Sequence, residues 1–549
     1  MSQNTPDLIV TNAVIWNGET LTEHTAMAVT AGKITALGGA EVAQLAGAKT
    51  EVVDAAGGLL TPGFVDCHNH TAMGGIERNS CDLTGCKNSE QAIAAVAAYA
   101  AANPEAEWIL GGGWRIPWFE GGTPLKEQLD AVVPDRPVYL LNADHHAAWA
   151  NSKALELAGI TADTADPSDG RIERDAAGNP NGTLQEGATA LVASVLPEYT
   201  PAVIRAGILA GEKYLFECGV TAWQEAILGD YGGYPDFSPV YAEMADAAEL
   251  TGRVTGALWV SRDFDGMTIP EYVADLTNRR AKYARAGFNL DHIKIMADGV
   301  QENGTAALTD PYVSDCNCAP ANTGLAYFSR DSLLELIPLL NEAEFDVHVH
   351  AIGDRAVKYA LDAFEAVPAA VREARHNHIA HLHVVDPVDL PRFAELGIRA
   401  NIQALWACQD QQMLDVTFPT LGENRIPWQY PFAGIAQHGA TLVCGSDWPV
   451  STPDPWQAVH VAVTRTQPGA EPGEPLLPEQ ALTLEQMLTA YHRNSAQLLR
   501  TGSGLVQVGE AADFAIADRN PFAAPMSELW QTTNKLTVVA GKVVFNAAA

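Results

Sequence analysis

The chain has 549 residues, of which 47% are hydrophobic and 18% charged, a composition typical of a large globular protein and not of a disordered one. Its 67 acidic residues outnumber the 33 basic ones, and the net charge of −34 disfavours nucleic acid and anionic membrane surfaces as partners. The sequence has no apolar run of the roughly 18–20 residues that would cross a membrane, and its first residues lack the pattern of a secretory signal, so we expect a cytoplasmic protein.

The two ends of the chain have similar sequence patterns. Short β-rich runs at 7–15, 25–37 and 50–54 are separated by turn residues, and residues 504–549 show a similar pattern. Between the two ends, apolar strands alternate with amphipathic helices over about 400 residues, which favours a parallel sheet closed into a barrel. The sequence therefore predicts an α/β protein with a distorted (β/α)8 TIM barrel at 61–500 and small β segments at 1–60 and 501–549.

Candidate barrel strands recur along the central region. The first is 63–70, and the next is either 108–113 or 138–144. The later ones are 219–226, 253–260, 292–299, 345–351, 378–385, 398–405 and 440–447. The region of about 76–215 is long for a single β/α unit and rich in glycine and proline loops, which predicts an insertion there.

His68 and His70 stand at the end of the first predicted strand. Alternate residues of a strand point to one face, so both imidazoles can reach one metal ion. The active sites of such barrels lie at the C-terminal ends of the strands, where this pair is placed. Because an isolated His-x-His pair is often structural, the prediction depends on ligands at other strand ends.

Lys294 lies inside the apolar run HIKIMADG, where an unpaired ammonium group is costly. One interpretation is a lysine that reaches the barrel rim or pairs with Asp298. The other is a carbamate formed with carbon dioxide, whose two oxygens bridge two metal ions. The sequence leaves both open.

Three later strand ends also carry groups that bind metals, namely His350, His381 and Asp447. Each one alone is compatible with core packing. Together with the histidine pair and the lysine, they follow one another at successive strand ends, and this order predicts a metal centre. His348 and His383 lie two residues from the predicted ligands and are alternatives by simple strand alternation.

An aromatic segment in the predicted insertion is a candidate wall for a substrate pocket. Trp114, Trp118 and Phe119 in GGGWRIPWFEGG could line a site for an apolar or aromatic substituent. Packing in a hydrophobic core is the competing interpretation.

These features occur in longer motifs that resemble a known family. The motifs are LLTPGFVDCHNH, PDRPVYLLNADHHAAWANSKALELAGI, NGTLQEGA, IKIMADGVQENGTAAL, VHVHAIGDRAV, IAHLHVVDPVDLPRFAELGI and VCGSDWPV. Spread over nearly the whole chain, they resemble the metal-dependent amidohydrolase superfamily, and within it the branch of N-substituted formamide deformylases. The motifs are specific for the family but not for a substrate.

The resemblance implies a role for each matching position. It implies that the two end segments build one composite β-sandwich. It also implies that Lys294 stands at the position of a lysine that is often carboxylated in the family. It implies a substrate-carbonyl contact at His146, for which a structural histidine of the loop is the other interpretation. It implies a substrate contact at His383, where the family more often has a polar residue that is not a ligand. The implied metal ligands are His68, His70, Lys294, His350, His381 and Asp447.

The predicted function is hydrolysis of a carbon–nitrogen bond, in a linear amide such as an N-substituted formamide or in a cyclic amide. A divalent cation, zinc by default, would supply hydroxide at neutral pH, and one or two ions are compatible with the ligand set. Asp447 would accept the proton of the attacking water and pass it to the departing nitrogen. We expect a small-molecule substrate and a homodimer.

Two alternatives remain open from the sequence. The same site could act on an ester, in a decarboxylation or in an elimination, because a fold does not fix the reaction. A binding protein without catalytic activity is the third hypothesis, and the complete ligand set argues against it.

Overall fold

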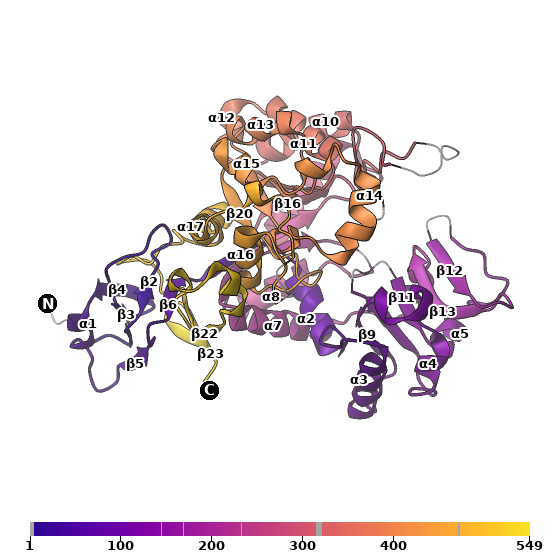
Figure 1. Cartoon of the computed structure of the whole chain (residues 1–549), viewed down its shortest axis with the longest axis horizontal. Helices are drawn as coiled ribbons and strands as arrows, with labels where there is room; N and C mark the ends of the chain where they lie inside the picture. Colours follow the sequence, from indigo (N-terminus) through magenta and orange to yellow (C-terminus); the bar gives the residue numbers. More distant parts are fainter. Residues whose placement is uncertain are drawn as a thin grey trace. The chain divides into compact units, whose positions relative to one another are not determined.

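The computed structural model of the protein describes residues 5–143, 145, 147–167, 170–231, 233–302, 304–313, 321–469 and 473–548. The chain forms two compact units (Figure 1). The first consists of Met1–His70, Lys213–Gly229 and Tyr241–Ala549, and the second of Thr71–Glu212 and Asp230–Val240. The boundaries between sandwich, barrel and insertion that the sequence suggests stay a prediction.

The first unit contains a parallel sheet of eight strands, the (β/α)8 barrel that the sequence predicts. In order, the strands are β7 (Phe64–Asn69), β14 (Val220–Leu228), β15 (Arg253–Trp259), β16 (Phe288–Met296), β17 (Asp346–Ala351), β18 (His378–His381), β19 (Arg399–Ile402) and β20 (Leu442–Cys444). A parallel bridge between Asn69 and Trp448 closes the ring, so the ends of the first and last strands are neighbours.

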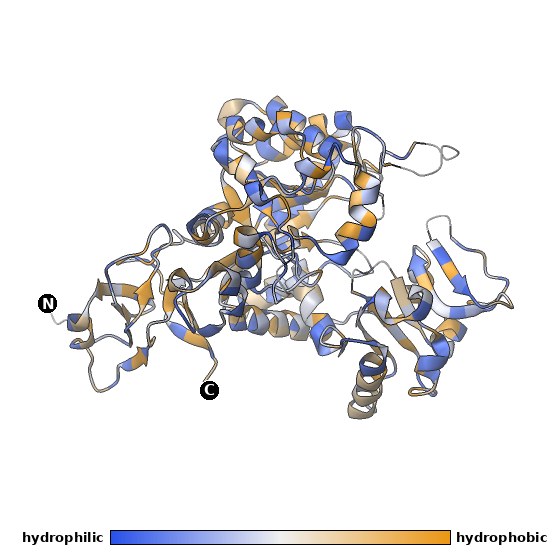
Figure 2. Cartoon of the chain, viewed as in Figure 1, coloured by the Kyte–Doolittle hydropathy of each residue, from blue (hydrophilic) through white to orange (hydrophobic). Residues whose placement is uncertain are grey.

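The barrel strands are almost completely buried because helices cover their outer face. All nine residues of β14 and all six of β17 are buried, as expected for parallel strands. The covering helices carry both apolar and polar residues, as α10 and α11 show in Figure 2. On α11 the apolar residues include Val357, Leu361 and Phe364, which are fully buried.

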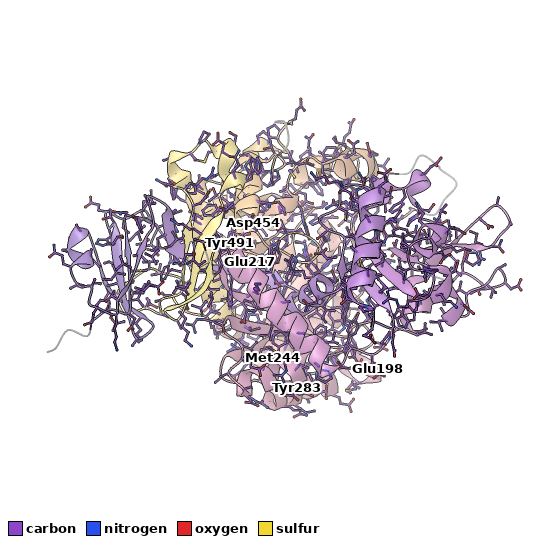
Figure 3. The ribbon with its side chains drawn as sticks, turned by 90° about the horizontal axis from the view of Figure 1, so that it is seen from below. Glu198, Glu217, Met244, Tyr283, Asp454 and Tyr491 are labelled. Carbon is purple, nitrogen blue, oxygen red and sulfur yellow. The ribbon has the colours of Figure 1, made fainter. Side chains whose placement is uncertain are left out.

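The helices of this unit are α1 (Ala40–Ala43), α9 (Ile269–Tyr283), α10 (Arg330–Glu342), α11 (Asp354–Ala366), α12 (Ala369–Arg372), α13 (Leu390–Glu395), α14 (Phe418–Leu421), α15 (Phe432–Gln437), α16 (Pro455–Thr464), α17 (Leu484–Thr489) and α18 (Ser495–Leu499). Two further helices contribute residues to both units, α7 (Pro201–Glu217), whose last residue is labelled in Figure 3, and α8 (Ser238–Asp246). In the part of the chain that the structure describes, no helix is both long and apolar enough to span a membrane.

Two small sheets combine the ends of the chain into the predicted sandwich. One contains β4 (Lys33–Gly38), β3 (Ala26–Thr30), β1 (Leu8–Thr11) and β5 (Glu51–Asp54). The other contains β2 (Val14–Ile15), β6 (Leu59–Pro62), β21 (Phe514–Ala517), β22 (Asn534–Val539) and β23 (Lys542–Asn546). Residues from both sheets, among them Val10, Met27, Phe514 and Val538, form one buried core, which stabilises the pairing of the two termini.

The second unit has its own sheet of six strands. They are β12 (Gly170–Arg174), β13 (Pro180–Glu186), β11 (Ala147–Ala150), β10 (Val138–Asn142), β9 (Ile109–Trp114) and β8 (Cys81–Asp82). Its helices are α2 (Thr71–Asn79), α3 (Ser89–Ala102), α4 (Lys126–Asp130), α5 (Ser152–Leu157) and α6 (Thr189–Ala193).

This sheet corrects one expectation from the sequence. The prediction that 108–113 or 138–144 supplies the second barrel strand is wrong, because β9 and β10 pair with each other and with β8 and β11. The second barrel strand is β14. Strand patterns alone do not say which sheet a strand joins, since the same apolar run suits either one.

Candidate metal centre and active site

Closure of the barrel brings His68, His70 and Asp447 together. The backbone amide of Asp447 donates to the carbonyl of His68 at 2.8 Å, next to the bridge that joins the first and last strands. The Oδ1 atom of Asp447 then lies 3.1 Å from Nε2 of His68 and 3.1 Å from Nε2 of His70. Burial acts to raise the pKa of Asp447, but the neighbouring imidazoles hold this pKa well below its usual value. The carboxylate is therefore ionised at neutral pH.

His381 completes a group of three buried side chains with His68 and Asp447. One ligand atom from each residue lies within 4.8 Å of the others. The backbone is left-handed at His381 (φ 80°) and at Asp447 (φ 56°), a region that costs roughly 1–3 kcal/mol for residues other than glycine. Two of the predicted ligands thus occupy strained positions, which is typical of functional sites.

Lys294 also reaches this group. Its Nζ atom lies 3.2 Å from Nε2 of His68, and the residue is 2% exposed. Asp298, the alternative partner from the sequence, accepts instead from the backbone amides of Ala307, Ile352 and Gly353. Burial lowers the pKa of Lys294 to about 7, so a large fraction of the amine is neutral near pH 7.

His350 and His348 occupy different places on β17. The ring of His350 lies 4.3 Å from that of His381, centroid to centroid, and its Nε2 atom lies 3.3 Å from the carbonyl oxygen of Gly299. His348 lies 3.1 Å from the other ring nitrogen of His68, Nδ1. Both side chains are buried, and the ring of His350 packs against that of His381.

Several buried polar residues that no sequence pattern predicts fix the segments that carry these side chains. Asp66 accepts from the hydroxyl of Ser446 at 2.6 Å and from the side-chain amide of Asn69 at 2.9 Å. Gln403 accepts the backbone N–H of His381 at 2.8 Å. The available signal for Asp66 was its place two residues before His68 on the same strand.

His383 lies in an aromatic environment next to His381. Its ring is 5.3 Å from Trp406 and 4.8 Å from Tyr430, and neither ring nitrogen has a hydrogen-bond partner among the described residues. A buried imidazole without partners suits a contact to a bound molecule. That His383 binds substrate stays a prediction, and His146 lies outside the described residues.

The aromatic segment of the second unit packs within that unit. Trp114 is fully buried and donates from Nε1 to the carbonyl of Leu140, and its ring lies 5.7 Å from Phe119. Phe119 in turn contacts Trp149, and Trp118 packs against the same core. This arrangement agrees with the core-packing alternative, while a role in a substrate pocket stays a prediction.

The donor set fits a divalent cation. Imidazole and carboxylate are the usual ligands of zinc and related metals, and here they converge in a buried place. Nδ1 of His70 and Nδ1 of His381 have no hydrogen-bond partner among the described residues, so each of these nitrogens can still bind a metal or form a hydrogen bond. We conclude that the residues present can hold a metal ion.

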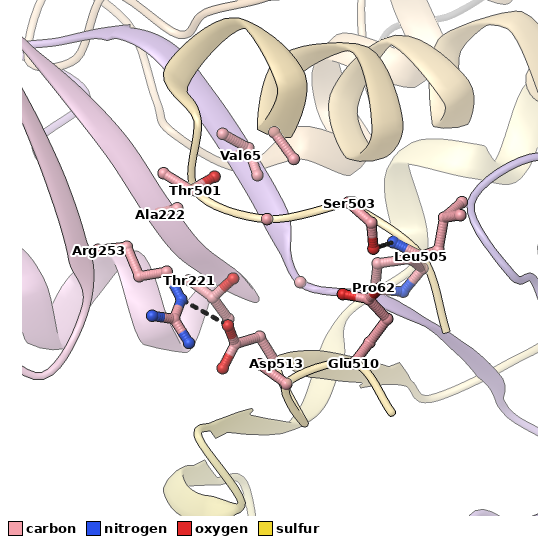
Figure 4. A pocket seen from close by; sticks show the side chains of 15 residues that line it. Pro62, Val65, Thr221, Ala222, Arg253, Thr501, Ser503, Leu505, Glu510 and Asp513 are labelled. Atoms are coloured by element: carbon pink, nitrogen blue, oxygen red, sulfur yellow. Dashed lines mark hydrogen bonds and ion pairs between the residues drawn. The ribbon is translucent and has the colours of Figure 1, made fainter. Parts of the chain in front are cut away.

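A separate pocket lies at the opposite end of the barrel (Figure 4). It is lined by the starts of β7, β14 and β15 and by the segment that leads into β21. Arg253 and Asp513 form an ion pair of 2.6 Å there. This pocket contains none of the predicted ligands and is not the candidate active site.

Gly445 gives a direct test of the packing around His68. An added Cβ atom would lie 2.5 Å from Cβ and 2.8 Å from the backbone nitrogen of His68. We expect Gly445→Ala to lower the free energy of unfolding by about 1–3 kcal/mol and to weaken metal binding, because His68 must move. Urea unfolding of the metal-free protein and zinc titration measure the two effects.

Gly85→Ala is the matched control for this substitution. An added Cβ at the exposed Gly85 would meet no atom within 4 Å, so both quantities should stay at the level of the parent protein. Equal stability and equal zinc affinity of the Gly445→Ala and parent proteins would contradict the close approach.

Known proteins resemble this chain over most of its length. The sequence profile of the amidohydrolase family matches residues 51–545. The YtcJ protein of Bacillus subtilis (strain 168) is 27% identical over 90% of this chain and 91% of its own length, and the N-substituted formamide deformylase of Arthrobacter pascens is 25% identical over 94% of both. A crystal structure of an uncharacterized metal-dependent hydrolase from Pyrococcus horikoshii superposes with a TM-score of 0.73 at 25% identity, over 94% of this chain and 99% of that one.

Proposed function

The chain belongs to the amidohydrolase family, and from this premise we propose that it is a metal-dependent hydrolase of a non-peptide carbon–nitrogen bond, in a linear or cyclic amide. The observation that carries the proposal is the convergence of His68, His381 and Asp447 within 4.8 Å at the C-terminal ends of three barrel strands. The activity for which the Arthrobacter pascens relative is named supports an amide as the substrate.

One or two divalent cations held by His68, His70, His350, His381 and Asp447 would activate water and polarise the scissile carbonyl. Asp447 is buried and ionised, and it is placed to accept the proton of the attacking water. It then returns this proton to the departing nitrogen, which makes the amine a better leaving group. The contacts of Oδ1 of Asp447 with Nε2 of His68 and of His70, each 3.1 Å long, orient this carboxylate.

We propose zinc as the metal and a carbamate on Lys294 as a bridge to a second ion. The neutral amine adds to carbon dioxide and loses one proton, so the reaction needs no other reactant. A pKa of about 7 keeps enough of the amine neutral for this addition. His350 and His381, whose rings are neighbours, would hold the second ion.

A substrate screen tests the proposal. Metal-loaded protein is incubated with N-substituted formamides, lactams, carboxylate esters and carboxylated aromatics, and the amine and acid products are measured. We expect at least one amide to give equal amounts of amine and acid, with turnover lost in the Asp447→Asn protein. Turnover of esters alone, or release of carbon dioxide without an amine, would replace the amide proposal by ester hydrolysis or decarboxylation.

A further inference from the structure

A line of buried histidines continues from His68 into the barrel interior. His348 lies next to His68, and the ring of His378 follows at 4.2 Å from that of His348, centroid to centroid. All three side chains are at most 1% exposed. None of the roles proposed above uses His348 or His378, and burying an imidazole costs free energy unless its nitrogens are hydrogen-bonded.

The contact between His348 and His68 has a defined direction. Nε2 of His348 lies 3.1 Å from Nδ1 of His68, whereas Nε2 of His68 faces Asp447 at 3.1 Å and Lys294 at 3.2 Å. His348 therefore contacts the edge of the His68 ring that points away from the metal ligands. His348 is therefore better placed to orient a metal ligand than to bind the metal itself.

A metal-binding imidazole needs one nitrogen without a proton. When Nε2 of His68 gives its lone pair to a metal, the proton of the neutral ring is on Nδ1, and this N–H needs an acceptor. In metal sites the acceptor is usually a carboxylate, a carbonyl oxygen or water. In this chain the atom at hydrogen-bond distance is Nε2 of His348.

We infer that His348 is a positioning residue, which accepts the Nδ1–H of His68 and so keeps Nε2 of His68 free and directed at the metal. The inference rests on the proposed metal centre. The β-sheet supports it, because β17 pairs with β16 so that His348 is directly opposite Lys294. The ring of His378, which packs 4.2 Å from that of His348, limits rotation of His348.

Zinc binding to the metal-free protein tests this role without any substrate. His348→Leu removes the acceptor, and we expect the dissociation constant for zinc to rise about 10–100-fold, the usual effect of losing such a partner. The number of ions bound at saturating zinc should not change, because no ligand is lost. His348→Gln places a carbonyl oxygen at a similar distance from the backbone, where it can accept the same hydrogen bond, and should restore most of the zinc affinity.

His492→Leu is the matched control. His492 is equally buried but packs 4.6 Å from Phe64, ring to ring, and touches none of the predicted ligands, so the zinc affinity of this variant should equal that of the parent. Circular dichroism and melting of the metal-free proteins verify the fold. If the leucine variant does not fold, His348→Met, which also lacks an oxygen acceptor, supplies the same comparison with His348→Gln.

Two results would overturn this inference and leave the proposed function unaffected. One is an unchanged zinc affinity in folded His348→Leu protein, and the other is the loss of a whole ion at saturating zinc in both the leucine and glutamine variants, which would make His348 a ligand. A parent protein that binds no zinc would instead remove the proposed function and this inference together, so the two failures are distinguishable.

Discussion

Asp447→Asn is expected to lower kcat by about 10²–10⁴-fold, the range usual for loss of a general acid–base group. Asparagine keeps the shape of the side chain but cannot take up the proton of the attacking water. The amide oxygen can still face the imidazoles of His68 and His70, so we expect the zinc content to stay near that of the parent. Steady-state kinetics on the amide found in the screen, with metal analysis of the same samples, measure both quantities.

Asp454→Asn is the control for this experiment. Asp454, labelled in Figure 3, is seven residues further along the chain and caps the N-terminus of α16 through the backbone amide of Trp456. Asparagine caps helices as well as aspartate does, so kcat should be unaffected. A near-parental kcat in the Asp447→Asn protein would contradict the assigned role of Asp447.

Removal of the metal is expected to lower turnover by about 10³-fold or more. A Lewis-acid metal supplies several kcal/mol of transition-state stabilisation, and about 1.4 kcal/mol corresponds to a factor of ten in rate. Dialysis against a chelator of divalent cations should therefore abolish activity, and addition of zinc should restore it. Activity and bound zinc are measured on the same samples along the titration.

The control for chelation is the same chelator saturated with zinc before use. It should leave activity unchanged, because it cannot withdraw metal from the protein. Full activity of protein from which the metal has been stripped would contradict the metal-dependent mechanism.

The parts of the fold that the sequence predicts well are those with a local signal. The eight barrel strands and the terminal sheets have continuous apolar or alternating patterns, and their approximate positions follow from these patterns. The pairing partner of a strand has no such signal. The sequence therefore predicts that either 108–113 or 138–144 is a barrel strand, whereas these runs form β9 and β10 of the second unit.

Sequence patterns also predict only part of the candidate site. Alternation along a strand explains why His68 and His70 lie on one face. It does not apply at His381 and Leu382, because both have positive φ and the strand ends there. The alternation that makes His383 an alternative to His381 in the sequence therefore does not hold in the structure.

Residues that hold the ligands were the hardest to predict. Asp66 and Gln403 act through hydrogen bonds to segments that are remote in sequence, such as Ser446 for Asp66. No sequence pattern predicts the hydrogen-bond partner of an aspartate or a glutamine on a strand. The contact of His348 with His68 joins residues 280 positions apart, and only the closed barrel brings them together.

Elemental analysis of purified, active protein tests the metal centre most directly. We predict at least one divalent ion per chain, with specific activity that rises in proportion to the ion content of each preparation. Fully active preparations that contain far less than one ion per chain would show that His68, His381 and Asp447 do not meet around a metal to do this chemistry.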